Sequence, residues 1–238
     1  MIQELKRKIV LAAYAAKEGH IASAFSILDI LYVLYTEVMQ PEDRFILSKG
    51  HASLALYAVL GSDLTDFGRY DSLLGGHPDR NKVPGVVAST GSLGHGLPMA
   101  VGIALARKIK SESGRVFCLV GDGECNEGSV WESILLASQH DLDNLTVIVD
   151  NNHSTDRSVN LTFLGPRFGS FGFAVSTVDG HDHAKLQKHL NEAFTRIPRV
   201  VIADTVKGKG CARMENNPEW HHKFPNSEEL TEILAELS

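Results

Sequence analysis

A carboxylate and a carboxamide stand just past two strand-like runs of the sequence, where together they could hold a metal ion. Asp122 follows RVFCLV, and Asn152 follows LTVIVD about thirty positions later. That separation matches one β-α-β unit, so the two side chains should emerge side by side at the same edge of a parallel sheet. Because no Cys or His cluster stands at ligand spacing, these oxygen donors favour a hard cation such as Mg²⁺ or Ca²⁺.

The glycines beside Asp122 indicate what else the site would bind. Gly121 and Gly123 leave the backbone bare, so a diphosphate can approach closely and accept hydrogen bonds from amide N–H groups. Mg²⁺ held by few protein oxygens normally has phosphate groups in its remaining positions. Taken alone, Asp122 is more simply a helix cap and Asn152 a turn residue. Their spacing and the neighbouring glycines favour the metal site.

Strands and helices alternate along the chain and would position this site. We expect strands at 45–47, 85–90, 115–120, 145–152, 173–180 and 199–206. Helices are expected at 2–13, 26–39, from about 52, 98–110, 129–142, 181–197 and 227–237, the last capped by Ser227. This order predicts an α/β fold, a doubly wound, mostly parallel sheet with helices on both faces. Residues 1–238 should form one domain with a C-terminal extension at about 207–238.

Composition and charge narrow the classes of function. Of 238 residues, 43% are hydrophobic and 22% are charged, as in a folded globular protein. The formal net charge of −6 argues against nucleic acid or an anionic membrane as the main partner. Three cysteines at unrelated positions indicate neither a disulfide framework nor a zinc site, and they suit a reducing cytoplasm.

The N-terminal segment superficially resembles a secretory signal, because basic residues precede a short apolar run. Its apolar positions recur at helical spacing, however, which favours an amphipathic helix. No apolar run approaches the roughly 20 residues needed to span a bilayer. We therefore expect a soluble, cytoplasmic protein that works on small molecules or with protein partners.

The motifs around the site resemble those of one family. GDG followed, after a strand-forming interval, by NN resembles the thiamine diphosphate signature, and the flanking sequence is similar to transketolase. Seven motifs stand in the family's order along nearly the whole chain: GH at 19–20, DRFILSKGH ending at His51, GGHP containing His77, TGSLGHG at 90–96, GDG with Glu127 and Glu132, DGHD from Asp179, and TVKGKG followed by MENNPEWHHK. The resemblance implies the thiamine diphosphate-binding fold of the PP type.

The resemblance also implies roles for single positions. Asp122 and Asn152 resemble the Mg²⁺ ligands, with the backbone carbonyl of Ser154 as the third. Gly123 resembles the contact to the cofactor's diphosphate. The histidines that surround the thiazolium, the diphosphate and the sugar hydroxyls in the family are matched by His20, His51, His77 and His221.

Further positions resemble the family's aminopyrimidine turn and subunit boundary. Gly91 and Leu93 are similar to the turn that holds the aminopyrimidine through its backbone. Glu127 and Glu132 resemble glutamates that couple the cofactor sites across the boundary, so Glu127 would take part in cofactor binding and catalysis. The helix at 26–39 and the segment 127–131 are candidates for the interface itself.

The function implied by the resemblance is the transfer of a two-carbon ketol unit from a ketose to an aldose. Full-length transketolases also carry a pyrimidine-binding domain with an activating glutamate. The resemblance implies that a C-terminal partner subunit supplies this domain here, in an α2β2 heterotetramer. Two alternatives stay open. One is another thiamine diphosphate reaction, such as dihydroxyacetone or deoxyxylulose synthesis or carboligation, and the other is a catalytically silent binding or regulatory module.

Several stretches depart from the family's pattern. HSTDRS at 153–158 replaces the usual isoleucine-aspartate-glycine, and the segment after Leu60 is shorter than expected. IASAF after His20 and the double histidine at 221–222 resemble transketolase-like subunits of sugar or surface-polysaccharide biosynthesis. An ordinary pentose phosphate substrate is therefore in doubt. The roles of three histidines stay undecided, namely His95, His181 and His222. Surface positions are expected for His140, His153, His183 and His189.

Overall fold

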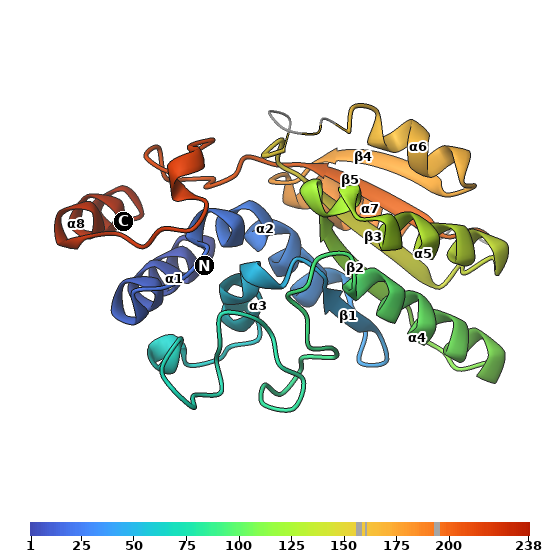
Figure 1. Cartoon of the computed structure of the whole chain (residues 1–238), viewed down its shortest axis with the longest axis horizontal. Helices are drawn as coiled ribbons and strands as arrows, with labels where there is room; N and C mark the ends of the chain where they lie inside the picture. Colours follow the sequence, from blue (N-terminus) through green and yellow to red (C-terminus); the bar gives the residue numbers. More distant parts are fainter. Residues whose placement is uncertain (156–158, 160, 193–195) are drawn as a thin grey trace.

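A parallel sheet of five strands runs through the computed structural model in the order β1-β2-β3-β5-β4 (Figure 1). The structure describes residues 1–155, 159, 161–192 and 196–238. The strands are β1 (Arg44–Leu47), β2 (Val116–Gly121), β3 (Leu145–Asn151), β4 (Ala174–Asp179) and β5 (Arg199–Asp204). The predicted strand at 85–90 is wrong, because this segment is a loop that follows a turn. Its valines pack against the core without joining the sheet.

Eight α-helices connect and cover the strands in the described part of the chain. They are α1 (Ile2–Ala16), α2 (Ile21–Val33), α3 (Ser53–Val59), α4 (Gly96–Lys110), α5 (Gly128–Gln139), α6 (Leu164–Ser170), α7 (His183–Asn191) and α8 (Ser227–Glu236). Alternate residues of β2 enter two separate hydrophobic clusters, with Phe117 in one and Cys118 in the other. The first cluster contains residues of α1, α2, α3 and α7, and the second contains residues of α4, α5 and α6. The expected doubly wound α/β fold is thereby confirmed.

The α2 helix is a core element. All of its residues except Tyr32 are buried, and its polar residues are limited to Ser23, Ser26 and Asp29. The stretch Ile21–Val38 is long and apolar enough to cross a membrane by composition alone, but 78% of it is buried inside the fold. The core helix of a folded domain passes the same test of length and composition. Placing 26–39 at a subunit interface is wrong for α2 itself, because the chain's own helices α1, α3 and α7 already cover it.

The C-terminal segment returns to the N-terminus, where α8 lies beside α1 (Figure 1). Arg7 Nη1 donates to the carbonyl oxygen of Leu234 at 2.8 Å. The predicted cap of α8 is off by one residue. Asn226 accepts from the Glu229 amide while the Glu229 carboxylate accepts from the Asn226 amide, and both bonds measure 2.9 Å. This reciprocal capping box makes Ser227 the first helical residue instead of the cap.

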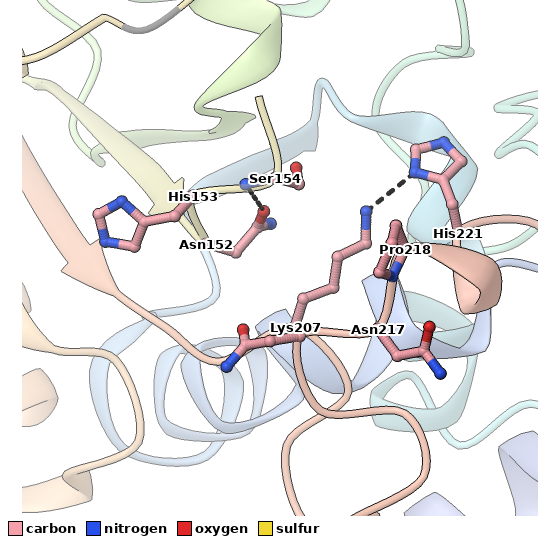
Figure 2. A pocket seen from close by; sticks show the side chains of 8 residues that line it. Asn152, His153, Ser154, Lys207, Asn217, Pro218 and His221 are labelled. Atoms are coloured by element: carbon pink, nitrogen blue, oxygen red, sulfur yellow. Dashed lines mark hydrogen bonds between the residues drawn. The ribbon is translucent and has the colours of Figure 1, made fainter. Parts of the chain in front are cut away.

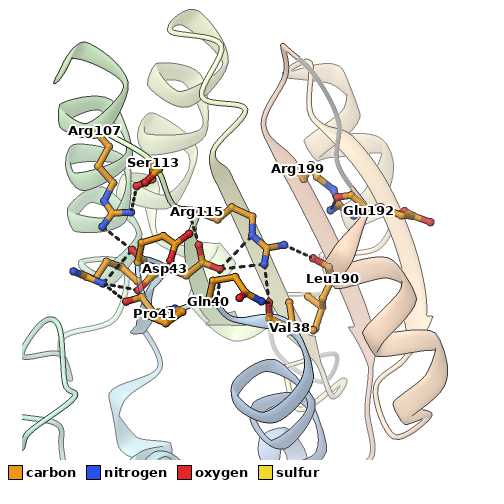
Figure 3. Close-up of polar contacts among 12 residues, drawn as sticks. Val38, Gln40, Pro41, Asp43, Arg107, Ser113, Arg115, Leu190, Glu192 and Arg199 are labelled. Atoms are coloured by element: carbon orange, nitrogen blue, oxygen red, sulfur yellow. Dashed lines mark hydrogen bonds and ion pairs between the residues drawn. The ribbon is translucent and has the colours of Figure 1, made fainter. Parts of the chain in front are cut away.

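An arginine cluster ties the other end of the sheet to the helices (Figure 3). Arg115 Nη2 donates to the buried carboxylate of Asp43 at 3.1 Å and to the carbonyl of Val38 at 2.8 Å. Its Nη1 donates to the carbonyl of Leu190 at 3.3 Å, near the end of α7. One guanidinium therefore links β2, α7 and the segment that follows α2.

Removing that guanidinium should destabilise the fold measurably. Arg115→Met keeps much of the side-chain volume but leaves Asp43 without its ion pair, so we expect a loss of about 2–3 kcal/mol in the free energy of unfolding. Urea denaturation of the full chain measures it. Arg69→Met is the matched control, because its ion pair with Asp66 is exposed, and it should unfold like the wild type. An unchanged midpoint in Arg115→Met would contradict the role given to this cluster.

Candidate active site

Asp122 and Asn152 meet at the carboxyl ends of β2 and β3. Their strands pair with Gly121 opposite Asp150. Asp122 Oδ2 and Asn152 Oδ1 each accept a hydrogen bond of 3.1 Å from the same donor, the amide of Ser154. Both side chains are 5% exposed. The expectation that they emerge side by side at one sheet edge is confirmed.

A buried carboxylate sets the orientation of the Asn152 amide. Asn152 Nδ2 donates to Asp150 Oδ2 at 2.7 Å, and since a carboxylate can only accept, Oδ1 must face the other way, toward Asp122. Asp150 is fully buried and also accepts from Ser26 at 2.6 Å, from Thr205 and from Lys49. Burial acts to raise the pKa of Asp150, but the Lys49 charge and these hydrogen bonds outweigh it and hold the pKa below its usual range.

This arrangement fits a divalent cation that carries phosphate groups. It offers one carboxylate oxygen and one amide oxygen, both hard donors. Burial, followed by the charge of Asp150, raises the pKa of Asp122, so a cation would relieve an electrostatic cost. No group of three His, Cys, Asp or Glu side chains in the described residues is placed to hold a metal. The structure turns the N–H of Ser154 toward the two oxygens, and the metal contact of its carbonyl stays a prediction.

The loops around these oxygens pack closely at their glycine positions. A Cβ atom on Gly123 would lie 2.5 Å from Thr155 Cγ2. On the facing loop, Gly91 has a φ of +151°, and a Cβ there would lie 2.7 Å from the His77 ring. Gly94 donates its N–H to Glu124 Oε1 at 2.8 Å. Residues with side chains would therefore push these loops apart.

A cavity of about 180 Å³ lies between these loops and the strand ends. Its walls combine two carboxylates, an amide, two lysines and two imidazoles with one apolar side chain, Leu93, which is 36% exposed. The predicted residues that line it are His51, Leu93, Asp122, Gly123, Asn152, Ser154 and His221. The structure thus brings most of the predicted site residues to one cavity.

Four imidazole rings cluster beside this cavity. The ring centroid of His20 lies 5.0 Å from that of His51, 5.5 Å from that of His221 and 4.6 Å from that of His222. His222, whose role the sequence left open, therefore belongs to the cluster. His77 is exposed and lies against Gly91 at its edge.

Burial keeps the inner rings of the cluster neutral. It lowers the pKa of His20 to about 4 and, together with the Lys49 charge, that of His51 to about 2. In the unfolded chain these rings take up protons near pH 6.5. Between pH 6.5 and 4 the unfolded state therefore binds more protons than the native state, and stability must fall as the pH falls.

We expect the free energy of unfolding to decrease from pH 6.5 toward pH 4, with His51→Gln reducing the slope by about 1.4 kcal/mol per pH unit for the one proton removed. Urea midpoints of the chain without cofactor at several pH values measure this. His140→Gln, at an exposed position after α5, should keep the wild-type slope. Equal slopes in all three proteins would refute a buried neutral His51.

Lys49 and Lys207 line the cavity but were missed as site residues from the sequence. Lys49 is 2% exposed and pairs with Asp150, and Lys207 is 7% exposed. Burial, followed by the Lys49 charge, lowers the pKa of Lys207 to about 8. Lys207 Nζ lies 2.9 Å from His221 Nδ1 (Figure 2). A lysine-glycine pair just past each of two strands was the signal available, since SKG follows β1 and VKG follows β5.

Glu124 was also missed and supports the loops. It is 2% exposed and accepts from Gly94, Gly121 and Ser48. The predicted Glu127 and Glu132 are exposed on the surface at α5, outside the lining of the cavity. If they act at a subunit boundary as predicted, they do so from the exposed surface of the chain and not from the wall of this cavity.

Two further histidines have partners that their motif did not reveal. His181 Nδ1 and His183 Nε2 contact the two carboxylate oxygens of Asp29 at 2.9 and 2.7 Å. His181 Nε2 accepts from the amide of Val206 at 2.9 Å. The surface position expected for His183 is therefore only partly right, and this group anchors the chain just before Lys207.

The family model described as transketolase, thiamine diphosphate binding domain matches residues 2–236. The chain belongs to the transketolase family. Two relatives, each named as one subunit of an apulose-4-phosphate transketolase, are similar to it along 98% of its length. The one from Phocaeicola vulgatus is 34% identical over 91% of its own chain, and the one from Actinobacillus succinogenes is 38% identical over 93%.

Solved transketolases share the fold over the whole chain. The transketolase from Leishmania mexicana superposes with a TM-score of 0.89 at 28% identity, and this chain spans 41% of it. The resemblance inferred from the motifs is thus confirmed at the level of a transketolase thiamine diphosphate-binding domain. The departure at 153–158 is described only as far as Thr155, since residues 156–158 lie outside the described part.

Proposed function

We propose that this chain is the cofactor-binding subunit of a split transketolase, which moves a two-carbon ketol unit from a ketose to an aldose. The carrying observation is the oxygen pair of Asp122 and Asn152, which adjoins a cluster of neutral imidazoles at the strand ends of a thiamine diphosphate-binding domain. Similarity over nearly their full length to relatives that are themselves named as single subunits of a transketolase supports the split arrangement.

The cofactor would be held by residues from four strand ends. Asp122, Asn152 and the carbonyl of Ser154 would hold Mg²⁺, or Ca²⁺ in its place, and Gly123 would contact the diphosphate. Lys49 and Lys207 supply positive charge in the same cavity. When bound, thiamine diphosphate supplies the nucleophilic carbon that accepts the ketol unit.

The imidazoles would bind the sugar and move its protons. Neutral rings both donate and accept hydrogen bonds, which suits hydroxyl groups. His51 is the most strongly neutral of them, so it would bind as a neutral ring and not as a cation. His20, His77 and His221 would complete the contacts. Gly91 and Leu93 would hold the aminopyrimidine.

A partner chain would complete the site. Glu127 and Glu132 are exposed on the same helical region as Leu135 and Leu136, which are 58% and 51% exposed. An apolar surface edged by glutamates is suited to a protein contact. We place the boundary with a C-terminal subunit here, in an α2β2 assembly, with Glu127 acting on the cofactor site across it. Residues 207–238 would form the domain's C-terminal extension.

The substrates follow from the relatives and from the departures in sequence. We propose a role in cytoplasmic sugar or surface-polysaccharide biosynthesis with a sugar other than an ordinary pentose phosphate. Apulose 4-phosphate, named in two relatives, is the first compound to test.

Reconstitution tests the proposal. The purified chain, thiamine diphosphate and Mg²⁺ should give little ketol transfer from a ketose to an aldose, and adding the cognate C-terminal subunit should produce it. Full activity of the chain alone would refute the split arrangement. Product formation without a ketose donor would favour another thiamine diphosphate carboligation. Failure of the complete assembly to bind the cofactor would favour a silent binding module.

A further inference from the structure

Two hydrogen bonds fix which nitrogen carries the proton in two of the site histidines. His20 Nδ1 lies 2.8 Å from the carbonyl oxygen of His221. A carbonyl can only accept, so Nδ1 of His20 must carry the hydrogen. In the neutral ring, Nε2 of His20 is then left with a lone pair.

The second bond has the opposite polarity. His221 Nδ1 lies 2.9 Å from the ammonium nitrogen of Lys207 (Figure 2). An ammonium can only donate, so Nδ1 of His221 must accept, and its hydrogen sits on Nε2. Burial and the Lys49 charge lower the pKa of Lys207 to about 8, against the carboxylates of Asp150 and Asp122, and at this pKa most of the Lys207 side chain is still an ammonium at pH 7.

We infer that Lys207 is a positioning residue that sets His20 and His221 as a complementary pair, one presenting a proton acceptor and the other an N–H donor. Their ring planes are nearly perpendicular, at 87°, with centroids 5.5 Å apart. Among the described residues, neither Nε2 atom has a hydrogen-bond partner within the chain. Both are therefore available to a ligand.

The chemical meaning of this pair rests on the proposed function. A sugar hydroxyl bound at the cluster would give its proton to Nε2 of His20, breaking the O–H bond and forming an N–H bond. The resulting imidazolium would return the proton in the reverse step, because burial opposes the charged ring. Meanwhile the N–H of His221 would donate a hydrogen bond to a neighbouring sugar oxygen. With the reverse tautomers, Nε2 of His20 would carry a hydrogen and could not take up the proton, and Nε2 of His221 could not donate a hydrogen bond.

Nitrogen-15 NMR of the histidine rings in the full chain tests the assignment directly, without cofactor, substrate or partner. Near pH 7, where Lys207 is mostly an ammonium, protonated and lone-pair ring nitrogens have widely separated shifts. We expect Nε2–H for His221 and Nδ1–H for His20. In Lys207→Met, His221 should shift to a mixture of both tautomers, whereas His20 should stay unchanged because its partner is a backbone carbonyl.

Two variants serve as controls. Lys207→Arg should keep the wild-type tautomer, because a guanidinium also only donates. Lys209→Met, in the same turn, should leave both rings as they are. A wild-type His221 protonated at Nδ1, or an unchanged His221 in a folded Lys207→Met, would overturn the inference. If Lys207→Met does not fold, the wild-type and Lys207→Arg spectra still decide. Because none of these spectra depends on ketol transfer, this inference can fail while the proposed function stands, and the reverse also holds.

Discussion

Asp122→Asn should lower Mg²⁺-dependent binding of thiamine diphosphate to the assembled enzyme by roughly 150-fold and reduce ketol transfer accordingly. Removing one member of a buried charge contact costs about 3 kcal/mol, and every 1.4 kcal/mol is tenfold in affinity. The substitution keeps the shape and one acceptor for the amides of Gly123 and Ser154. It also removes a carboxylate whose pKa is raised by burial and by Asp150, so the chain without cofactor should stay folded.

Calorimetric titration of the chain with its partner subunit, at fixed Mg²⁺, measures the affinity. Asp143→Asn is the matched control, since this exposed carboxylate precedes β3 at the opposite edge of the sheet, and its affinity should equal the wild-type value. Raising the Mg²⁺ concentration should partly restore binding in Asp122→Asn. If Asp122→Asn binds the cofactor within a factor of two of the wild-type affinity at low Mg²⁺, Asp122 does not hold the metal.

The parts of the fold that depend on short-range pattern were predictable. The β2-α5-β3 unit follows from apolar runs separated by an amphipathic segment, and that unit places Asp122 beside Asn152 with no further information. The same reasoning wrongly predicted a strand at 85–90, because a short apolar run packs as well beside a sheet as within it. The interface predicted at α2 was wrong for a different reason. The all-round apolar character of this helix required burial, but nothing local indicated that the chain would provide the cover itself.

The missed site residues are charged groups whose burial depends on the tertiary structure. Lys49 and Asp150 are far apart in sequence, and each alone resembles a surface residue of a loop or strand end. Only the pairing of β1 with β2 and of β2 with β3 brings them together beneath the cavity. The histidines were predictable by type and motif, but their tautomers required the contacts to Lys207 and to a backbone carbonyl.

That buried pair provides the largest expected effect on stability. Lys49→Met would leave the carboxylate of Asp150 without its cation at a position with no exposure to water. Breaking a buried ion pair from one side costs about 3–5 kcal/mol. We expect a loss of this size in the free energy of unfolding at pH 7, measured by urea denaturation. Lys8→Met, which removes an exposed ion pair with Glu4, should unfold like the wild type.

The pH dependence separates an unpaired charge from lost packing. In the wild type the pKa of Asp150 is lowered, so its contribution is present above the unfolded value, about 3.9, and is lost only as the pH falls through the lower folded value. In Lys49→Met burial is no longer opposed by the ammonium, so the folded pKa should rise above the unfolded one. The native variant then takes up a proton first, and its deficit relative to wild type must shrink as the pH falls from 7 to 5. Relief of His51 from the Lys49 charge acts in the same direction.

Lys49→Met/Asp150→Asn should recover most of the loss at pH 7, because the amide carries no charge to bury. If the loss in the free energy of unfolding does not depend on pH and is not recovered in the double variant, Lys49 contributes by packing alone.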